Sequence, residues 1–441
     1  MNTSNKVMFD DIPINKFHVK MAAITFGAHF QDGFSIGVIA LALTAITPAL
    51  GLSTLWVSLI ASSALIGLFF GSFFLGWAAN KIGRSKIFML NFVVICICTF
   101  MQFFVQSALM LFILRLLIGI GLGGDYSVGH TMLAEYLPRK NRGVILGAFS
   151  VIWTFGYVLA IVCGVLLAPL ADNWRWLLVA AFPMALAVLI LRIGTPESPR
   201  WLVKNGRINE ANAIVHKYFG EHVSLDDEIG NLKQGDKTQG TFSELFSPKL
   251  IKRTAFNGIF SACLVAPYFA IYTFLPGILE MMGLGENFTT TLFINAFLVI
   301  GAIVGLWMTA KFSRRGFLIG SFLFLAVTLL LLGIVPSHLK LLLIIDFVAF
   351  TLIMSAVSNL FGVFPAECFP TEVRSLGVGF ATACSRVGAA MGTFLLPFSV
   401  NGLGIPWTMT WMAGVLLIGA IVSIAWAPET KYATLNEASC I

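Results

Sequence analysis

Charged side chains inside apolar stretches are the residues of this chain that could do chemistry. Arg386 is the single charged residue of GFATACSRVGAAMG, residues 379–392, and Asp32 and Asp125 interrupt similar stretches. A charge at the centre of a bilayer costs roughly 2.5–3.5 kcal/mol on insertion scales. If these stretches cross a membrane, each of the three residues needs a function or a partner.

Asp32 and Asp125 are candidate proton-coupling groups, and we expect the stronger role for Asp125. Asp32 lies 12 residues after Lys20, and Asp125 lies 10 residues before Glu135, so helical rise places them roughly 18 and 15 Å deep. A carboxylate withdrawn from water takes up protons more readily near neutral pH. The alternative is structural, with hydroxyl groups or an arginine holding each carboxylate to order the helices.

Arg386 is the candidate substrate anchor. It lies 12 residues after Arg374, roughly 18 Å deep by the same rise. A guanidinium can hold a carboxylate with two parallel hydrogen bonds, which favours an anionic substrate. The alternative is a structural partner for an acid on another helix, such as Asp32. For Arg115, a structural anchor and a proton relay stay equally open.

Aromatic and polar residues suggest further contacts for a substrate. Trp153 and Tyr157 are one helical turn apart, as are Tyr268 and Tyr272, and Asn359 is a polar candidate of lower weight. Packing is the alternative for each tyrosine.

Two histidines lie near the acidic residues. His29 precedes Asp32 by one turn on the same helix face. His130 lies about 140° around its helix from Asp125 and shares the face of Tyr126. We interpret His130 as a structural histidine held by a hydrogen bond.

The elements that position these residues are membrane-spanning helices. The chain has 441 residues, of which 58% are hydrophobic and 11% charged, whereas soluble domains carry about 25% charged residues. Apolar runs of about 20 residues, long enough to cross about 30 Å of hydrocarbon, recur along it. The twelve predicted spans are residues 20–46, 55–79, 87–106, 109–135, 144–169, 174–194, 254–280, 287–310, 316–335, 339–365, 375–400 and 405–427.

The distribution of charge predicts the orientation of these spans. If the N-terminus is cytoplasmic, 24 of the 28 Lys and Arg lie in inner loops and tails, whereas the outer loops hold Arg175 and Lys340. By the positive-inside rule, both termini are cytoplasmic, and the net charge of +7 reflects topology rather than nucleic-acid binding. The predicted parts are residues 1–19 (N-terminal tail), 20–194 (first six-helix bundle), 195–253 (central cytoplasmic loop), 254–427 (second six-helix bundle) and 428–441 (C-terminal tail).

The two halves repeat one pattern. EYLPRKNRG begins at Glu135 and ECFPTEVRS begins at Glu367, and both read E-x-x-P-x-x-x-R. A parallel repeat of two six-helix halves around a central site is typical of a transporter.

Three motifs carry a resemblance that covers essentially the whole chain. GWAANKIGRSK (76–86) resembles the loop signature of the major facilitator superfamily, RLLIGIGLGGDYSVGHTMLAEYLPRKNRG (115–143) resembles its fourth span, and PESPRWL (196–202) resembles the segment after span 6 in sugar-porter-like members. The resemblance implies an all-α membrane protein of twelve helices in two pseudo-symmetric bundles that works as a monomer.

The same resemblance suggests several roles. GGDY around Asp125 is similar to the span 4 motif of phosphate:proton and related symporters, in which the acid couples transport. Organic-acid members place an arginine where this chain has Arg386. An inner gate of carboxylates and guanidinium groups on opposite sides of a proline break is implied for Arg84, Glu135, Arg142, Glu367 and Arg374. Asn80 replaces the aspartate of the loop signature, which changes the charge of that gate.

The sequence contains no nucleotide-binding loop, no catalytic triad and no metal-ligand spacing, so we expect neither an ATP-driven pump nor an enzyme, and no cofactor beyond the proton gradient. The fifth span lacks the Gly-Pro motif of drug antiporters, and the seventh lacks the paired Gln of sugar porters. We therefore predict proton-coupled uptake of a small organic anion, such as an aliphatic or aromatic monocarboxylate, across the plasma (inner) membrane. The alternatives are a phosphate or neutral sugar or polyol symporter and, from another class, a sensor that no longer transports.

Overall fold

The structure is a computed structural model whose description rests on most of the chain. The described residues are 7–138, 140–141, 145–146, 148–167, 170, 172–226, 229, 241–283, 288–336, 338–370 and 373–429. Within them, ten helices are long and apolar enough to cross a membrane, and a shorter apolar helix covers Phe149–Gly164.

The first bundle contains the six predicted spans of the N-terminal half. Ser53 and Ser107 cap the second and fourth helices by accepting hydrogen bonds from Trp56 N and Met110 N. The sixth span is broken near Pro183, which occupies the first turn of its second piece. The helices are α1 (Lys16–Ala49), α2 (Thr54–Ile82), α3 (Arg84–Met101), α4 (Ala108–Tyr136), α6 (Phe149–Leu167), and α7 (Asn173–Val179) with α8 (Phe182–Arg192).

The second bundle repeats this arrangement with more breaks. The seventh and tenth spans are each divided in two, at Phe274 and at Asn359. The last two spans are two helices that share the label α18 and are separated by a kink at Gly404, where φ is +80°, a conformation that favours glycine. The helices are α12 (Ile251–Thr273), α13 (Leu275–Met281), α14 (Phe288–Lys311), α15 (Arg314–Ile334), α16 (Lys340–Ser358), α17 (Leu360–Cys368) and α18 (Arg374–Trp426).

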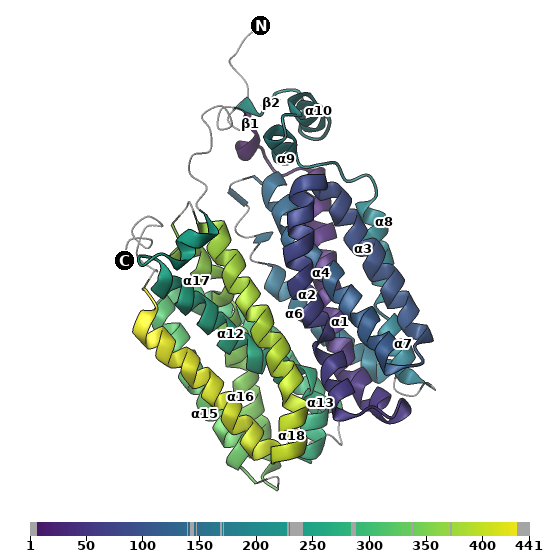
Figure 1. Ribbon diagram of the computed structural model, residues 1–441, viewed down its shortest axis with the longest axis vertical. Helices are drawn as coiled ribbons and strands as arrows, with labels where there is room; N and C mark the ends of the chain where they lie inside the picture. The colour runs from purple at the N-terminus through teal and green to yellow at the C-terminus, as the bar shows by residue number, and fades with distance from the viewer. Residues whose placement is uncertain are drawn as a thin grey trace.

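Short elements gather at one end of the first bundle, which we call the tail side because it carries the described start of the chain (Figure 1). Strand β1 (Val7–Met8) pairs in parallel with β2 (Val223–Ser224), next to α9 (Pro199–Lys204) and α10 (Ile208–Phe219). Tyr136, at the end of α4, donates its hydroxyl to the carbonyls of Pro196 and Glu197. The central loop is therefore attached to the first bundle. Short 3₁₀ turns in the described part of the chain lie at Phe9–Asp11, Gln102–Phe104 and Phe242–Phe246.

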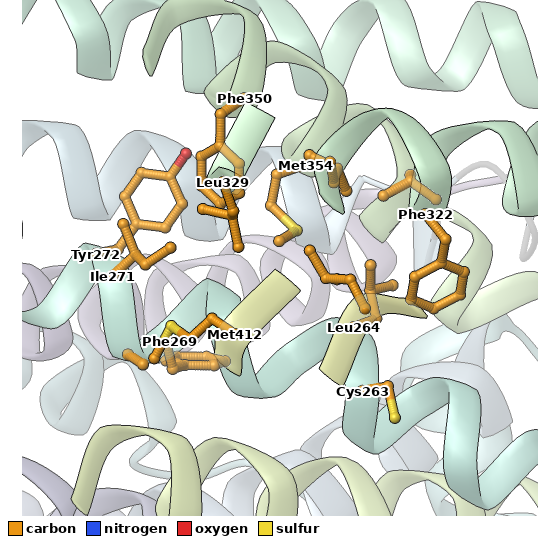
Figure 2. Close-up of a cluster of buried hydrophobic side chains, with 14 of the residues drawn as sticks. Cys263, Leu264, Phe269, Ile271, Tyr272, Phe322, Leu329, Phe350, Met354 and Met412 are labelled. Carbon is orange, nitrogen blue, oxygen red and sulfur yellow. The ribbon is translucent and has the colours of Figure 1, made fainter. Parts of the chain in front are cut away.

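The core of the second bundle is apolar and built from side chains of several helices. Figure 2 shows Leu264 and Phe269 of α12 with Phe350 and Met354 of α16 and Met412 of α18. These side chains are at most 7% exposed. Such close packing leaves the core of the second bundle little room to deform.

The two bundles lie side by side and converge away from the tail side (Figure 1). The core cluster of the second bundle takes in Ile36, Leu65 and Ile161 of the first bundle, so the halves share apolar packing there. The cluster on the tail side of the first bundle contains only residues of the first half and the central loop, within the described part of the chain. Apolar contact between the halves is thus concentrated toward the end opposite the tail side.

Candidate functional site

Asp32 lies at the middle of α1, where α1, α4 and α6 meet. One of its carboxylate oxygens, Oδ2, accepts hydrogen bonds from the Tyr126 hydroxyl (2.6 Å) and from Trp153 Nε1 (2.7 Å). Asp32 is 1% exposed, and its Oδ1 has no hydrogen-bond partner among the described residues. Asp32 is therefore held by two neutral donors, with one oxygen left to receive a proton or another donor.

Two glycines allow this close arrangement. A Cβ on Gly33 would lie 2.0 Å from the carbonyl oxygen of Trp153, and a Cβ on Gly156 would lie 2.0 Å from that of Phe30. Helices α1 and α6 thus approach backbone to backbone, which brings the Trp153 indole within reach of Asp32.

Arg386 of α18 faces this group from the other half. Its guanidinium carbon lies 4.9 Å from the ring centroid of Tyr126, a cation–π distance. Arg386 is 7% exposed, and its Nε has no hydrogen-bond partner among the described residues. The positive charge of Arg386 interacts electrostatically with the carboxylate of Asp32, although the described contacts include no direct ion pair between the two. Tyr126 separates the guanidinium from the carboxylate and contacts both.

Arg115 belongs to α4 and contacts α1 about one turn beyond Asp32. Its Nη1 donates to the carbonyl of Ser35 at 3.2 Å, and its charge also acts on Asp32. Arg115 is 2% exposed, so it is an internal residue of the first bundle. This position fits both of the alternative roles predicted for Arg115, a structural anchor and a proton relay.

Asp125 is paired with an arginine that the sequence analysis counted among the loop charges. Arg192, at the end of α8, places its Nη2 2.6 Å from Asp125 Oδ1 and donates from Nη1 to the carbonyl of Phe88 at 2.6 Å. Its guanidinium carbon lies 3.5 Å from the Phe88 ring centroid and 3.9 Å from that of Phe92. Arg192 is fully buried, so its assignment to the inner loops was wrong. The signal was present in the apolar run VLILR that it ends.

The predicted aromatic residues meet across the two halves. Trp153 and Tyr157 stack with ring centroids 5.8 Å apart, and Trp153 lies 6.3 Å from Tyr268. The Tyr157 hydroxyl donates to the carbonyl of Tyr272 at 2.8 Å. Since Trp153 also donates to Asp32, the aromatic group connects this carboxylate with α12 of the second half.

Asn359 sits at the break between α16 and α17 and serves the contact between helices. Its amide nitrogen donates to the carbonyl of Ala302 at 3.0 Å, and its oxygen accepts from Ser150 of the first half at 3.2 Å. These bonds occupy both ends of the amide. Asn359 therefore makes a contact between the two halves, and its part in substrate binding stays a prediction.

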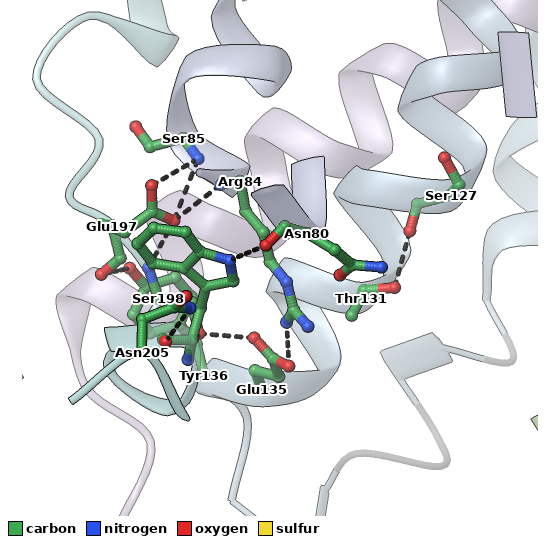
Figure 3. Close-up of polar contacts among 11 residues, drawn as sticks. Asn80, Arg84, Ser85, Ser127, Thr131, Glu135, Tyr136, Glu197, Ser198 and Asn205 are labelled. Carbon is green, nitrogen blue, oxygen red and sulfur yellow. Dashed lines mark hydrogen bonds and ion pairs between the residues drawn. The ribbon is translucent and has the colours of Figure 1, made fainter. Parts of the chain in front are cut away.

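The predicted gate residues of the first half form a polar network on the tail side (Figure 3). Arg84 forms an ion pair with Glu135, which also accepts a 2.5 Å hydrogen bond from Ser198 Oγ. Glu197 accepts from the backbone N–H groups of Arg84 and Ser85 at 3.0 and 3.1 Å and so caps the start of α3. Trp201 Nε1 donates to the carbonyl of Asn80 at 3.0 Å.

The second half repeats the network with different detail. Arg314, which begins α15 as Arg84 begins α3, lies 3.7 Å from Glu367, and Glu429 accepts from Arg314 N at 3.1 Å. The ion pairs thus link the third and fourth helices of each half. We expected each Glu to pair with the Arg beyond its proline; Arg374 instead donates from Nε to the carbonyl of Phe369 at 3.2 Å. Arg142, the matching residue of the first half, lies outside the described residues.

The described residues contain no group of three or more His, Cys, Asp or Glu arranged to hold a metal ion. The site consists of a guanidinium, a carboxylate and aromatic rings at the contact of two helical bundles. A family model described as "Sugar (and other) transporter" matches residues 20–441. The chain belongs to this family of the major facilitator superfamily.

Relatives of this transporter extend over nearly its whole length. It is 52% identical over 432 residues to the inner membrane metabolite transport protein YgcS of Escherichia coli, covering 98% of this chain and 96% of that protein. It is 27% identical to the arabinose-proton symporter of Bacillus subtilis, covering 92% and 90%.

The fold matches solved structures of the superfamily. The inward-open conformation of the xylose transporter XylE from Escherichia coli superimposes with a TM-score of 0.79 at 20% identity, covering 96% of this chain and 99% of that one. The all-α fold predicted from the sequence is therefore confirmed, and the chain is a multi-pass membrane transporter with inner-membrane relatives.

Proposed function

We propose that this transporter takes up a small organic anion together with protons, by alternating access between the two sides of the inner membrane. The observation that supports this most is the position of Arg386. Its guanidinium lies between the halves on the ring of Tyr126, is nearly buried, and has an Nε with no hydrogen-bond partner among the described residues. A buried cation without a directly bound carboxylate is unfavourable, and a carboxylate of the substrate would form the missing ion pair with Arg386.

Asp32 is our first choice for the coupling group, ahead of the Asp125 favoured by the sequence. Asp125 is held directly by the Arg192 guanidinium, which stabilises its charged form and opposes protonation. Asp32 has only the neutral donors Tyr126 and Trp153, and it lies in the same group of side chains as Arg386. Protonation of Asp32 would weaken both hydrogen bonds and free Trp153, which contacts the second half.

We further propose that the two networks on the tail side form the inner gate, with both termini in the cytoplasm. Arg84, Glu135 and Glu367 take part in matched ion pairs of the two halves, and Arg374 donates to the carbonyl of Phe369, two residues after Glu367. Ion pairs at matched positions could release and re-form together as the halves rock, whereas isolated surface pairs contribute only about 0–1 kcal/mol.

A neutral sugar is the second candidate substrate. The family description and the arabinose-proton symporter among the relatives favour it. The absence of the sugar porters' paired Gln in the seventh span, noted from the sequence, counts against it.

Uptake into proteoliposomes tests the proposed function. The purified chain is reconstituted, a proton gradient directed inward is imposed, and accumulation of labelled D-gluconate, benzoate, phosphate and L-arabinose is compared. We expect accumulation of a carboxylate that a protonophore abolishes. Accumulation of arabinose or phosphate alone would replace the proposal with one of its alternatives, and binding without accumulation would favour the sensor.

A further inference from the structure

His29 and His130 form a pair of contacting rings that the proposed transport mechanism does not use. Their ring centroids lie 4.4 Å apart with the planes tilted by 33°, although the residues come from α1 and α4. Phe149 of α6 contacts both rings, with its ring centroid 4.2 Å from that of His29 and 4.3 Å from that of His130. His29 is 3% exposed, whereas His130 is half-buried.

The hydrogen bonds of the two rings define what their free nitrogens can do. His29 Nδ1 lies 3.1 Å from the carbonyl of Thr25, and His130 is hydrogen-bonded to the carbonyl of Tyr126. The Nε2 atoms of both rings are buried and have no hydrogen-bond partner among the described residues, so the bond of His130 also comes from Nδ1. A carbonyl can only accept, so each Nδ1 carries the hydrogen, and each Nε2 of a neutral ring presents a lone pair.

The neutral form is favoured by the surroundings of the pair. The charge of Arg386 acts on both rings, and the rings are in contact with each other. Protonation of either ring would add a positive charge to a group of side chains that already holds the Arg386 guanidinium. The pair therefore offers two hydrogen-bond acceptors to its surroundings and no free donor.

Tyr126 joins this pair to the anion anchor. Its ring lies 4.9 Å from the ring of His29 and 5.4 Å from that of His130, and Arg386 lies 4.9 Å from the same ring. Arg386 and the two histidines thus contact the same tyrosine ring, so a carboxylate bound to Arg386 would lie on the residue that the two unpaired acceptors adjoin. An alkyl chain would leave these acceptors without partners, whereas hydroxyl groups would donate to them.

We propose that His29 and His130 bind hydroxyl groups of the substrate, and that the substrate is a hydroxylated carboxylate of the sugar-acid class. This inference rests on the proposed anion anchor and names the chemistry of the molecule attached to it. A sugar acid carries both the carboxylate that the proposed anchor Arg386 would bind and hydroxyl groups like those of the sugars named in the family description.

The test compares two six-carbon monocarboxylates, D-gluconate and hexanoate, by isothermal titration calorimetry on the purified full chain. We expect the wild type to bind D-gluconate at least tenfold more tightly than hexanoate. His130→Phe keeps the stack but removes the acceptor, so it should lose this preference and leave hexanoate unchanged. His130→Gln places an amide oxygen near the position of Nε2 and should retain most of the preference.

A second variant covers the case in which His130→Phe does not fold. His130→Asn has the same amide, but its shorter side chain does not reach the Nε2 position, so it should behave as the Phe variant. Equal binding of D-gluconate and hexanoate by the wild type, or equal loss of both in His130→Phe, would overturn the inference. Failure of the anion anchor is distinguishable, because Arg386→Ala would then bind both ligands as the wild type does.

Discussion

The hydroxyl of Tyr126 donates a 2.6 Å hydrogen bond to Asp32. The same tyrosine carries the Arg386 guanidinium over its ring, 4.9 Å from the centroid. One side chain of α4 therefore contacts both the proposed coupling group and the proposed substrate anchor, which belong to different halves. A change in the charge of Asp32 would change its hydrogen bond with Tyr126, and Arg386 packs against the ring of this tyrosine. Proton binding and substrate binding would therefore both act on Tyr126.

Asp32→Asn should abolish proton-driven accumulation while leaving counterflow exchange largely intact. The amide still accepts from Tyr126 and Trp153, but it cannot take up a proton, and exchange needs no net proton movement. Both activities are measured in the same proteoliposomes, with Asp125→Asn as the matched carboxylate variant, compared at a temperature below its melting temperature. If Asp32→Asn accumulates substrate normally and Asp125→Asn does not, the coupling role returns to Asp125.

The Asp125–Arg192 pair should behave as a structural unit in thermal unfolding. Removal of one partner of a buried ion pair leaves an uncompensated charge and costs roughly 3–5 kcal/mol. We expect Asp125→Asn or Arg192→Met to lower the melting temperature strongly, and the double variant to lower it by less than the sum of the two. Additive losses would mean that the two residues do not stabilise each other.

Gly83→Ala should destabilise the start of α3. Gly83 has φ of +118°, and an added Cβ would lie 2.6 Å from Glu197 Oε2, which caps this helix. The backbone strain costs about 1–3 kcal/mol, and displacement of Glu197 adds to it. Gly206→Ala is the control, because Gly206 has φ of +75° but open space around it. Equal melting temperatures of the two variants would show that Glu197 adjusts without loss.

The predicted orientation is tested by labelling single cysteines in intact cells with an impermeant thiol reagent. Ser53 and Gly402 are exposed at helix ends opposite the tail side, whereas Lys204 is exposed on it. Cysteines at the first two positions should react from outside, and one at Lys204 should not. The reverse pattern would place the tail side outside the cell.

The sequence predicted the elements and the repeat better than it predicted the partners of individual residues. Each predicted span coincides with described helices, because an apolar run of membrane length has few other ways to satisfy its backbone. The division of the sixth, seventh and tenth spans was not predicted, since periodicity and composition change little across a short break. Two of these three breaks, in the sixth and seventh spans, lie beside a proline.

Pairs between distant helices were the harder problem. Arg192 stands at the end of a predicted span, where an error of a few residues in the boundary decides whether a charge is buried. Its contact with Asp125 depends on the packing of α8 against α3 and α4, which no local pattern contains. For the same reason Tyr126 was noted only as a neighbour of His130, and Glu367 was matched with the Arg of its own motif and not with Arg314.

The most direct test of the anion anchor is the affinity of Arg386 variants for a carboxylate and for its neutral amide. Calorimetry on the purified chain compares D-gluconate with D-gluconamide and benzoate with benzamide. The wild type should prefer the carboxylate of the pair that it binds. Arg386→Lys keeps the charge but loses the two-pronged donor; loss of one charge-assisted hydrogen bond, about 1.5–3 kcal/mol, predicts roughly 10- to 150-fold weaker binding. Arg386→Ala should lose the preference entirely while remaining folded, as judged by its melting temperature. If Arg386→Ala instead binds the carboxylate as tightly as the wild type, the substrate is not anchored at Arg386 and the account is wrong.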